Sequence, residues 1–171
     1  MKIIFAVLAV FLLPPERQAA GASSAAEACA LLTNVEIEAS LGESVKDRKP
    51  GAQATGPLTT SQCYFATSAA RSVSLTVTRR SASGHSTLTV REYWRRQFHA
   101  PEHDQDAEPD RRARPIADVG EEAYWTGNRF AGALYVLKGE AFLRISIGGI
   151  RDEEARIATS KALALAALKR L

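Results

Sequence analysis

Period-two alternation of apolar and polar side chains is the feature that most restricts how this chain can fold. It is clearest at residues 71–78, where valine and leucine alternate with serine and threonine. Because successive side chains of a strand point to opposite faces of a sheet, this pattern predicts a strand with one buried face. Residues 61–67 place Cys63 and Phe65 in the same way, so we expect the two segments to form a half-buried antiparallel pair.

Four more segments have the composition of strands. Residues 43–49 precede a loop rich in glycine and proline at 50–57. Three consecutive segments, at 122–126, 131–138 and 140–147, are separated by turns that contain glycine. Hairpin signals outnumber crossover signals, which favours antiparallel pairing throughout.

Three helices are predicted between and after these strands. Thr33 and Glu36 form a capping box, as do Thr89 and Glu92, and each box indicates the start of a helix. The last helix is expected to begin after Asp152 and to bury one apolar stripe, which we assign to Ile157, Ala158, Ala162, Leu165 and Leu168.

This order of elements predicts the α+β fold class, with an antiparallel sheet of about five to six strands and helices packed on one face. We expect the apolar side chains of residues 71–78 and 140–147 to pack against Leu165 and Leu168 of the last helix. A chain of 171 residues has room for one domain of this kind with a sizeable core.

The N-terminus has the pattern of a secretory signal peptide. Lys2 precedes an apolar run at 3–13 that is too short to span a bilayer, and Pro14-Pro15 then ends the run. Small residues follow, and Ala20-Gly21-Ala22 fits the cleavage pattern. The alternative is a buried N-terminal helix of the mature fold.

The chain therefore divides into a predicted signal peptide at 1–22, a flexible leader at 23–28 and a single α+β domain at 29–171. We expect the protein to be exported, either periplasmic or secreted, with no transmembrane segment in its mature form. We also expect a monomer.

The chain contains two cysteines, Cys29 and Cys63. An exported chain meets an oxidising compartment, where an even pair usually forms a disulfide, so we expect the two to be joined, with Cα atoms within about 7 Å of each other. A lipidated Cys29 is the alternative. Glu27 stands where a lipobox is small and apolar, however, and lipidation would leave Cys63 as a free thiol.

The most specific functional site that the sequence suggests is a metal-binding site. His99 and His103 are four residues apart, with Asp104 beside them as a third possible ligand. Histidines at i and i+4 share one face of a helix and can bind zinc or copper, but Pro101 interrupts a helix here, so a loop would have to gather the ligands. The alternative is a solvated, charged loop with two incidental histidines, and we expect no cofactor.

The charge of the chain does not favour nucleic acid as a partner. The formal net charge is +3, whereas nucleic-acid binding calls for a concentrated basic face. One interpretation of the arginines is a basic patch for phospholipid or an acidic glycan, and the simpler one is solvated arginines on an outer helix face. The arginines concerned are Arg79, Arg80, Arg91, Arg95 and Arg96.

Catalysis by a nucleophile has little support in the sequence. The chain has no G-x-S-x-G motif, and both cysteines are assigned to a disulfide. Aromatic residues, by contrast, are numerous, and those that remain on the open face of the sheet could line an apolar ligand groove. They are Tyr93, Trp94, Tyr124, Trp125 and Tyr135.

The pattern Cys-Ala-Leu-Leu-Thr-x-x-Glu that begins at Cys29, followed by Cys63-Tyr64 on a strand, resembles a family of exported bacterial domains of unknown function that includes actinobacterial lipoproteins. Residues 120–125 and 143–147 resemble the later strands of that family. The resemblance implies a PsbP/Mog1-like α/β sandwich and a bridge between the two cysteines, and it brings no catalytic residues. This chain departs from the lipoprotein members because it lacks a lipobox, so membrane tethering is not implied.

Our first hypothesis for function is a non-catalytic envelope module that binds a small ligand or another envelope protein. The sheet face or the loop at 102–114 would provide the contacts. The alternatives are an envelope enzyme, metal-assisted if it is one, and a metal-binding protein that uses His99 and His103.

Overall fold

The computed structural model describes residues 27–81, 88–99 and 113–171. The strands are β1 (Val45–Thr55), β2 (Leu58–Thr67), β3 (Ser72–Arg80), β4 (Arg114–Pro115), β5 (Glu122–Gly127), β6 (Gly132–Lys138) and β7 (Ala141–Gly148). The helices are α2 (Asn34–Leu41), α3 (Val90–Phe98) and α5 (Glu153–Ala167). Both capping boxes are present, with Thr33 and Thr89 as the N-cap residues of α2 and α3.

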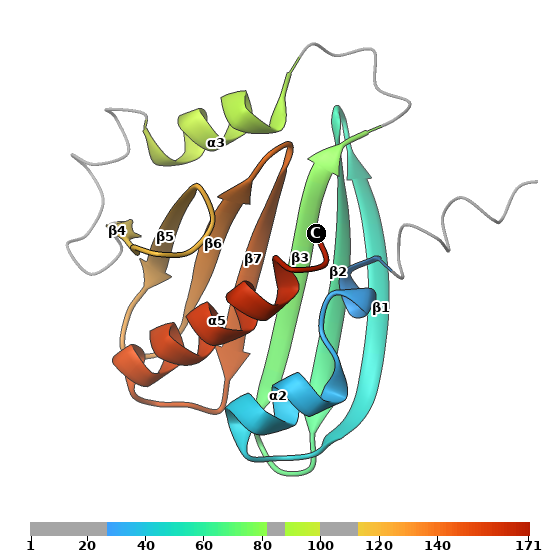
Figure 1. Ribbon diagram of the computed structural model, residues 1–171, viewed down its shortest axis with the longest axis vertical. Helices are drawn as coiled ribbons and strands as arrows, with labels where there is room; N and C mark the ends of the chain where they lie inside the picture. Colours follow the sequence, from blue (N-terminus) through green and yellow to red (C-terminus); the bar gives the residue numbers. More distant parts are fainter. Residues whose placement is uncertain (1–26, 82–87, 100–112) are drawn as a thin grey trace, which may run out of the picture.

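All seven strands belong to one antiparallel sheet, in the order β1-β2-β3-β7-β6-β5-β4. The predicted α+β fold class and antiparallel pairing are therefore confirmed. Two meanders, β1 to β3 and β5 to β7, meet where β3 pairs with β7 (Figure 1). The strand count slightly exceeds the predicted five to six because a short segment, Arg114–Pro115, adds to the edge of β5 as β4.

The N-terminal edge of the sheet is longer than predicted. The segment expected to be a loop at 50–57 instead continues β1 as far as Thr55, and Pro50 pairs in register with Cys63. Proline lacks the amide proton of a ladder, but β1 is an edge strand, where one side of the backbone needs no partner. Composition alone suggested a loop because it did not show that this strand lies at an edge.

One face of the sheet carries the main core. Val73, Leu75 and Val77 of β3 are buried, as the alternation predicted. They pair in register with buried residues of β7. Helices α2 and α5 cover this face, and Figure 1 shows both in front of the sheet. The β7 residues are Leu143, Ile145 and Ile147.

The predicted apolar stripe of the last helix is only partly right: Ile157 is buried and Leu168 packs against the core, but the other three residues do not face it. Leu165 is 43% exposed, and Ala158 and Ala162 are exposed as well. The reason is Arg156, whose buried guanidinium lies over the Trp125 ring and donates to the carbonyl of Asn128, an arrangement that the apolar pattern does not reveal. With Arg156 turned inward, the buried face of α5 consists of Ile157, Ser160, Leu163, Ala164 and Ala167.

The predicted disulfide is confirmed. Cys29 and Cys63 are joined, and their Cα atoms are 5.0 Å apart. Cys63 lies on the core face of β2, so the disulfide attaches the segment before α2 to this face of the sheet. A hydrogen bond of 2.9 Å from the Ala28 amide to the Ser61 hydroxyl supports the same attachment.

Helix α3 lies on the opposite face of the sheet from α2 and α5. Val90 and Trp94 of α3 pack with Leu58, Leu137 and Phe142 in a second, smaller apolar cluster. By the alternation of the strands, these three sheet residues point away from the main core. Helices α2 and α5 thus pack on one face of the sheet, as predicted, whereas α3 departs from the prediction and covers one end of the other face.

Within the part of the chain that the structure describes, no helix has both the length and the apolar character required to cross a membrane.

Candidate ligand site on the open face of the sheet

The sheet face opposite the main core is polar wherever α3 does not cover it. Strand β3 directs hydroxyl side chains to this face, among them the half-buried Ser74, whereas Thr78 further along the strand is buried. Ser74 accepts a hydrogen bond of 3.1 Å from Gln62, and Thr78 lies 3.3 Å from the Thr60 hydroxyl. These positions follow from the core, because a strand that buries every second side chain directs the others to this face. We call this surface the open face.

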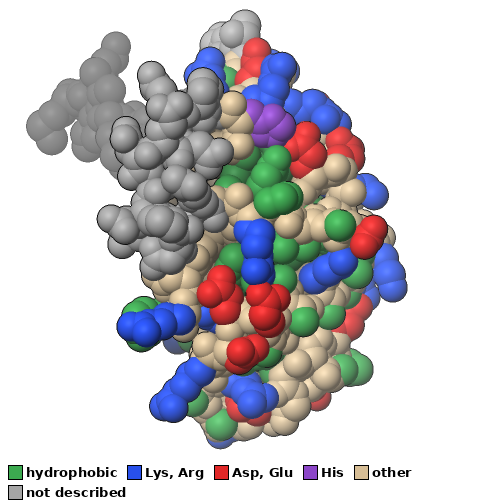
Figure 2. All heavy atoms as spheres, turned by 90° about the vertical axis from the view of Figure 1, so that its left-hand side faces the viewer, with side chains coloured by type: hydrophobic (Ala, Val, Ile, Leu, Met, Phe, Trp, Pro, Cys, Tyr) green, Lys and Arg blue, Asp and Glu red, His purple; other side chains and the backbone are tan. Residues whose placement is uncertain are grey.

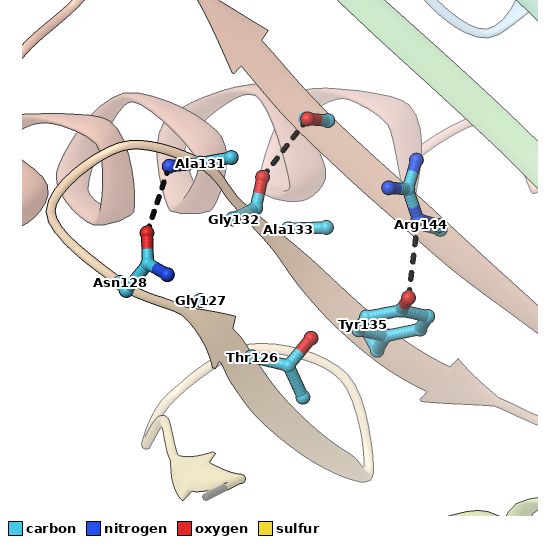
Figure 3. A pocket seen from close by; sticks show the side chains of 9 residues that line it. Thr126, Gly127, Asn128, Ala131, Gly132, Ala133, Tyr135 and Arg144 are labelled. Atoms are coloured by element: carbon cyan, nitrogen blue, oxygen red, sulfur yellow. Dashed lines mark hydrogen bonds between the residues drawn. The ribbon is translucent and has the colours of Figure 1, made fainter. Parts of the chain in front are cut away.

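A wide, open hollow of about 410 Å³ lies on the open face over β5, β6 and β7. Its polar side chains come from three strands and one turn, and alanine and glycine between them leave the space open (Figure 3). The lining residues are Thr126, Gly127, Asn128, Ala131, Gly132, Ala133, Tyr135, Arg144 and Ser146. We call this site the sheet hollow.

The floor of the sheet hollow depends on close packing beneath it. A Cβ on Gly132 would stand 2.3 Å from the ring of Trp125, which fills the core side of the β5–β6 hairpin. A Cβ on Gly127 would meet the Cα of Gly132 at 2.5 Å. Both positions therefore require glycine, and they let the two strands approach each other under the site.

Arg144 supplies the charge of the sheet hollow. It is half-buried, and its Nε donates a hydrogen bond of 3.1 Å to the hydroxyl of Tyr135, its cross-strand neighbour. The lining includes no acidic side chain, and no carboxylate among the described residues lies within ion-pairing distance of Arg144. The guanidinium is thus oriented through Nε, and it is available to bind an anion through its two Nη atoms.

The turn between β5 and β6 forms the other end of the sheet hollow. The side-chain oxygen of Asn128 accepts hydrogen bonds from the amides of Phe130, at 2.9 Å, and Ala131, at 3.2 Å. Its amide nitrogen therefore points away from Ala131 (Figure 3). The buried Arg156 holds the Asn128 carbonyl from below, so the turn is fixed from both sides. Asn128 and Arg144 thus offer donors at opposite ends of one hollow.

A smaller hollow, of about 100 Å³, opens between α3 and the sheet. Its lining is aromatic apart from Gln97, and Tyr135 belongs to both hollows. The aromatic residues are Tyr93, Trp94, Phe98, Tyr135 and Phe142. We call this site the aromatic cleft.

The aromatic residues singled out by the sequence divide between the two faces. Tyr93, Trp94 and Tyr135 line the aromatic cleft, and Tyr124 stacks on Phe98 with ring centroids 4.9 Å apart. Trp125 is instead buried in the main core. The expected groove lined by aromatic side chains is thus present beside α3, without a contribution from Trp125.

Glu122 anchors α3 to the sheet. Its carboxylate accepts hydrogen bonds from Trp94 Nε1 at 3.0 Å and lies 2.8 Å from His99 Nε2. The hydrogen bond from Trp94 is the main reason why the pKa of Glu122 lies below its ordinary value, and the bond to His99 lowers it further. Figure 2 shows the histidine beside a patch of hydrophobic side chains at this end of the molecule.

The predicted metal site falls mostly outside the described residues. His103 and Asp104 are not among them, whereas His99 is the C-cap of α3 and contacts Glu122. In the described ranges, no cluster of three or more histidine, cysteine, aspartate or glutamate side chains could hold a metal ion.

Two of the five arginines considered as a basic patch form ion pairs with carboxylates. Arg91 contacts Glu121 at 2.5 Å and Glu140 at 3.6 Å, and Arg79 contacts Glu27 at 2.5 Å. Compensated charges of this kind suit the interpretation of ordinary surface arginines.

Arg144, Asn128 and Ser146 are site residues that the sequence analysis missed. The signal for Arg144 was its place in an alternating strand, between the apolar Leu143 and Ile145, which directs it to the open face. The sequence does not show that α3 leaves this part of the face uncovered.

Comparisons with protein-family models, with curated proteins and with solved structures found no match to this chain.

Proposed function

We propose that this protein is an exported, non-catalytic binding module that holds a small ligand with an acidic group in the sheet hollow. The observation that carries the proposal is Arg144, a half-buried cation without a carboxylate partner among the described residues, on the wall of a hollow of about 410 Å³. Placing a cation among neutral side chains leaves its charge available, and a bound anion would compensate it.

The other lining groups suit an anion with further polar atoms. Thr126 contributes a hydroxyl and Asn128 an amide nitrogen, while Tyr135 already orients the guanidinium. The Ser146 hydroxyl donates to the Gly132 carbonyl at 2.9 Å, so its oxygen is directed by that bond and can accept a hydrogen from the ligand. Ligand-binding sites typically combine a few hydrogen-bond donors and acceptors with one charged group, as this hollow does.

Export is part of the proposal. The N-terminal pattern at 1–22 and the Cys29–Cys63 disulfide support it, because disulfides persist mainly in oxidising compartments. The resemblance of the segment around Cys29 to exported bacterial domains points in the same direction.

The direct test is a titration followed by nitrogen–proton NMR, in which the Arg144 Nε–H and the Asn128 side-chain amide give their own signals. Butyrate and inorganic phosphate serve as probes, with the disulfide formed. We expect saturable shifts at these two groups. In Arg144→Gln, which lacks the guanidinium signal, we expect the shift at the Asn128 side-chain amide to be abolished. Arg80→Gln, which removes an exposed arginine from the β3 end of the same sheet, is the matched control and should leave the shifts unchanged.

The proposal fails if the anions shift no signal of the sheet hollow. It also fails if Arg144→Gln binds them as well as the unaltered protein does.

A further inference from the structure

Tyr135 connects the two hollows of the open face. Its hydroxyl accepts the hydrogen bond from Arg144 in the sheet hollow, at 3.1 Å. Its ring meets Phe98 edge-on in the aromatic cleft, with centroids 5.3 Å apart. One side chain thus separates a cationic compartment from an apolar one.

We infer that the ligand is an amphipathic organic acid, whose acidic group binds Arg144 and whose apolar body enters the aromatic cleft past Tyr135. This inference rests on the proposed function and adds the chemical class of the ligand. The two hollows share Tyr135 in their linings, so a single small molecule reaches both if its acidic group and its body are separated by about the length of a tyrosine ring.

The cleft suits an apolar body because its walls are aromatic. Tyr93 is 38% exposed, and its ring stacks on Phe142 with centroids 5.8 Å apart and an interplanar angle of 4°. Trp94 behind them is buried, with its indole nitrogen already bonded to Glu122. An apolar group in the cleft would cover aromatic surface that otherwise faces water, which is favourable.

Charge supports the same orientation of the ligand. The cleft lining contains no acidic or basic side chain, and Gln97 is its one side chain with an amide. The sheet hollow contains one cation and no anion. A ligand that placed its acidic group in the cleft would lose water without gaining a counter-charge, so the acid belongs at Arg144.

The test compares phenylbutyrate with two analogues that each lack one part, butyrate without the ring and phenylbutanol without the acid. Dissociation constants come from nitrogen–proton NMR, with the Gln97 side-chain amide reporting on the cleft and the Arg144 Nε–H on the sheet hollow. We expect phenylbutyrate to shift both signals and to bind about tenfold more tightly than either analogue, which corresponds to about 1.4 kcal/mol.

Two tyrosines of equal exposure provide the variant and its control. Tyr93→Ala removes a wall of the cleft, and Tyr64→Ala removes a tyrosine, likewise 38% exposed, from β2. We expect Tyr93→Ala to erase most of the tenfold advantage of phenylbutyrate over butyrate while butyrate itself binds as before. Tyr64→Ala should preserve that advantage.

The outcomes separate the inference from the function on which it rests. If butyrate binds through Arg144 but phenylbutyrate binds no more tightly, or if Tyr93→Ala leaves the advantage intact, the amphipathic ligand is wrong and the anion site stands. If phenylbutyrate binds equally well to Arg144→Gln, both the anion site and the inference are overturned.

Discussion

The two faces of the sheet use the same strands for different purposes. On the core face, Leu143 and Ile145 of β7 are fully buried beneath α5. On the open face, Arg144 and Ser146 of the same strand line a hollow and are half-buried. Burial fixes every second side chain and leaves the intervening ones free to vary without loss of the core. A strand of this kind can therefore carry stability on one side and recognition on the other.

The covering helices differ between the faces in the same way. Helices α2 and α5 contribute mainly aliphatic side chains to one continuous core. Helix α3 packs through aromatic rings, among them Trp94, and is anchored by polar contacts to Glu122. Aromatic packing that stops part of the way across the sheet leaves the aromatic cleft at its margin.

The largest effect on the core face should come from the disulfide. Replacing Cys29 and Cys63 together by serine removes a constraint that closes a loop with a sequence separation of 34. We expect a loss of about 3 to 4 kcal/mol in the free energy of unfolding, measured by urea denaturation. Acid binding at low temperature, where the variant is still folded, should be unchanged. A loss below about 1 kcal/mol would show that the bridge does not constrain the chain.

Two leucines of α5 test which face of that helix is buried. Leu163 is 1% exposed and Leu165 is 43% exposed. We expect Leu163→Ala to cost about 3 kcal/mol because it leaves a cavity in the core, and Leu165→Ala to cost less than about 1 kcal/mol. The free energies of unfolding of the two variants are compared by thermal and urea denaturation. Equal losses of stability would contradict the assignment of the buried face of α5 given above.

A smaller, pH-dependent effect should come from Glu36, which ties α2 to the end of α5. The pKa of Glu36 is lowered to about 2. The main cause is the hydrogen bond that its carboxylate accepts from the Thr33 amide, and the hydrogen bond from Arg170 comes next. Because the pKa is depressed in the folded state, the stabilisation is present above the ordinary value of 4.5 and is lost as the pH falls toward 2.

We expect Glu36→Gln to cost about 1 kcal/mol at pH 6, as the loss of a capping interaction does. The difference between the variant and the unaltered protein should shrink as the pH is lowered through this window, which unfolding curves at several pH values would show. A difference that stays constant with pH would rule out Glu36 as the titrating group.

Local patterns in the sequence were sufficient for most of the fold. Alternation at 61–67 and 71–78, together with the turn residues and the capping boxes, predicted most elements and the antiparallel sheet, because these features depend on neighbours along the chain. Two features were not predictable in this way: the continuation of β1 past Pro50, and the burial of the α5 face that carries Arg156. Both depend on contacts between distant segments. Strand β1 tolerates Pro50 because it lies at the edge of the sheet, and Arg156 is buried because it donates to the carbonyl of Asn128.

The candidate site was predictable only in outline. An aromatic groove on the open face was expected, and Tyr135 is part of it. Arg144 was not singled out, because a strand arginine becomes a binding group only where the covering helix ends, and the extent of α3 over the sheet is a property of the assembled fold. For the same reason, the sequence offered no sign that Asn128 closes the hollow.

Two neighbouring residues of β7 test the division of labour between the faces most directly. Leu143→Ala and Arg144→Gln are compared for the free energy of unfolding and for the dissociation constant of phenylbutyrate. We predict that Leu143→Ala loses about 2 to 5 kcal/mol and still binds the acid when folded, whereas Arg144→Gln changes stability by less than about 1 kcal/mol and loses binding. If Arg144→Gln instead destabilised the protein as much as Leu143→Ala and bound the acid unchanged, Arg144 would be a structural residue and the central claim would be contradicted.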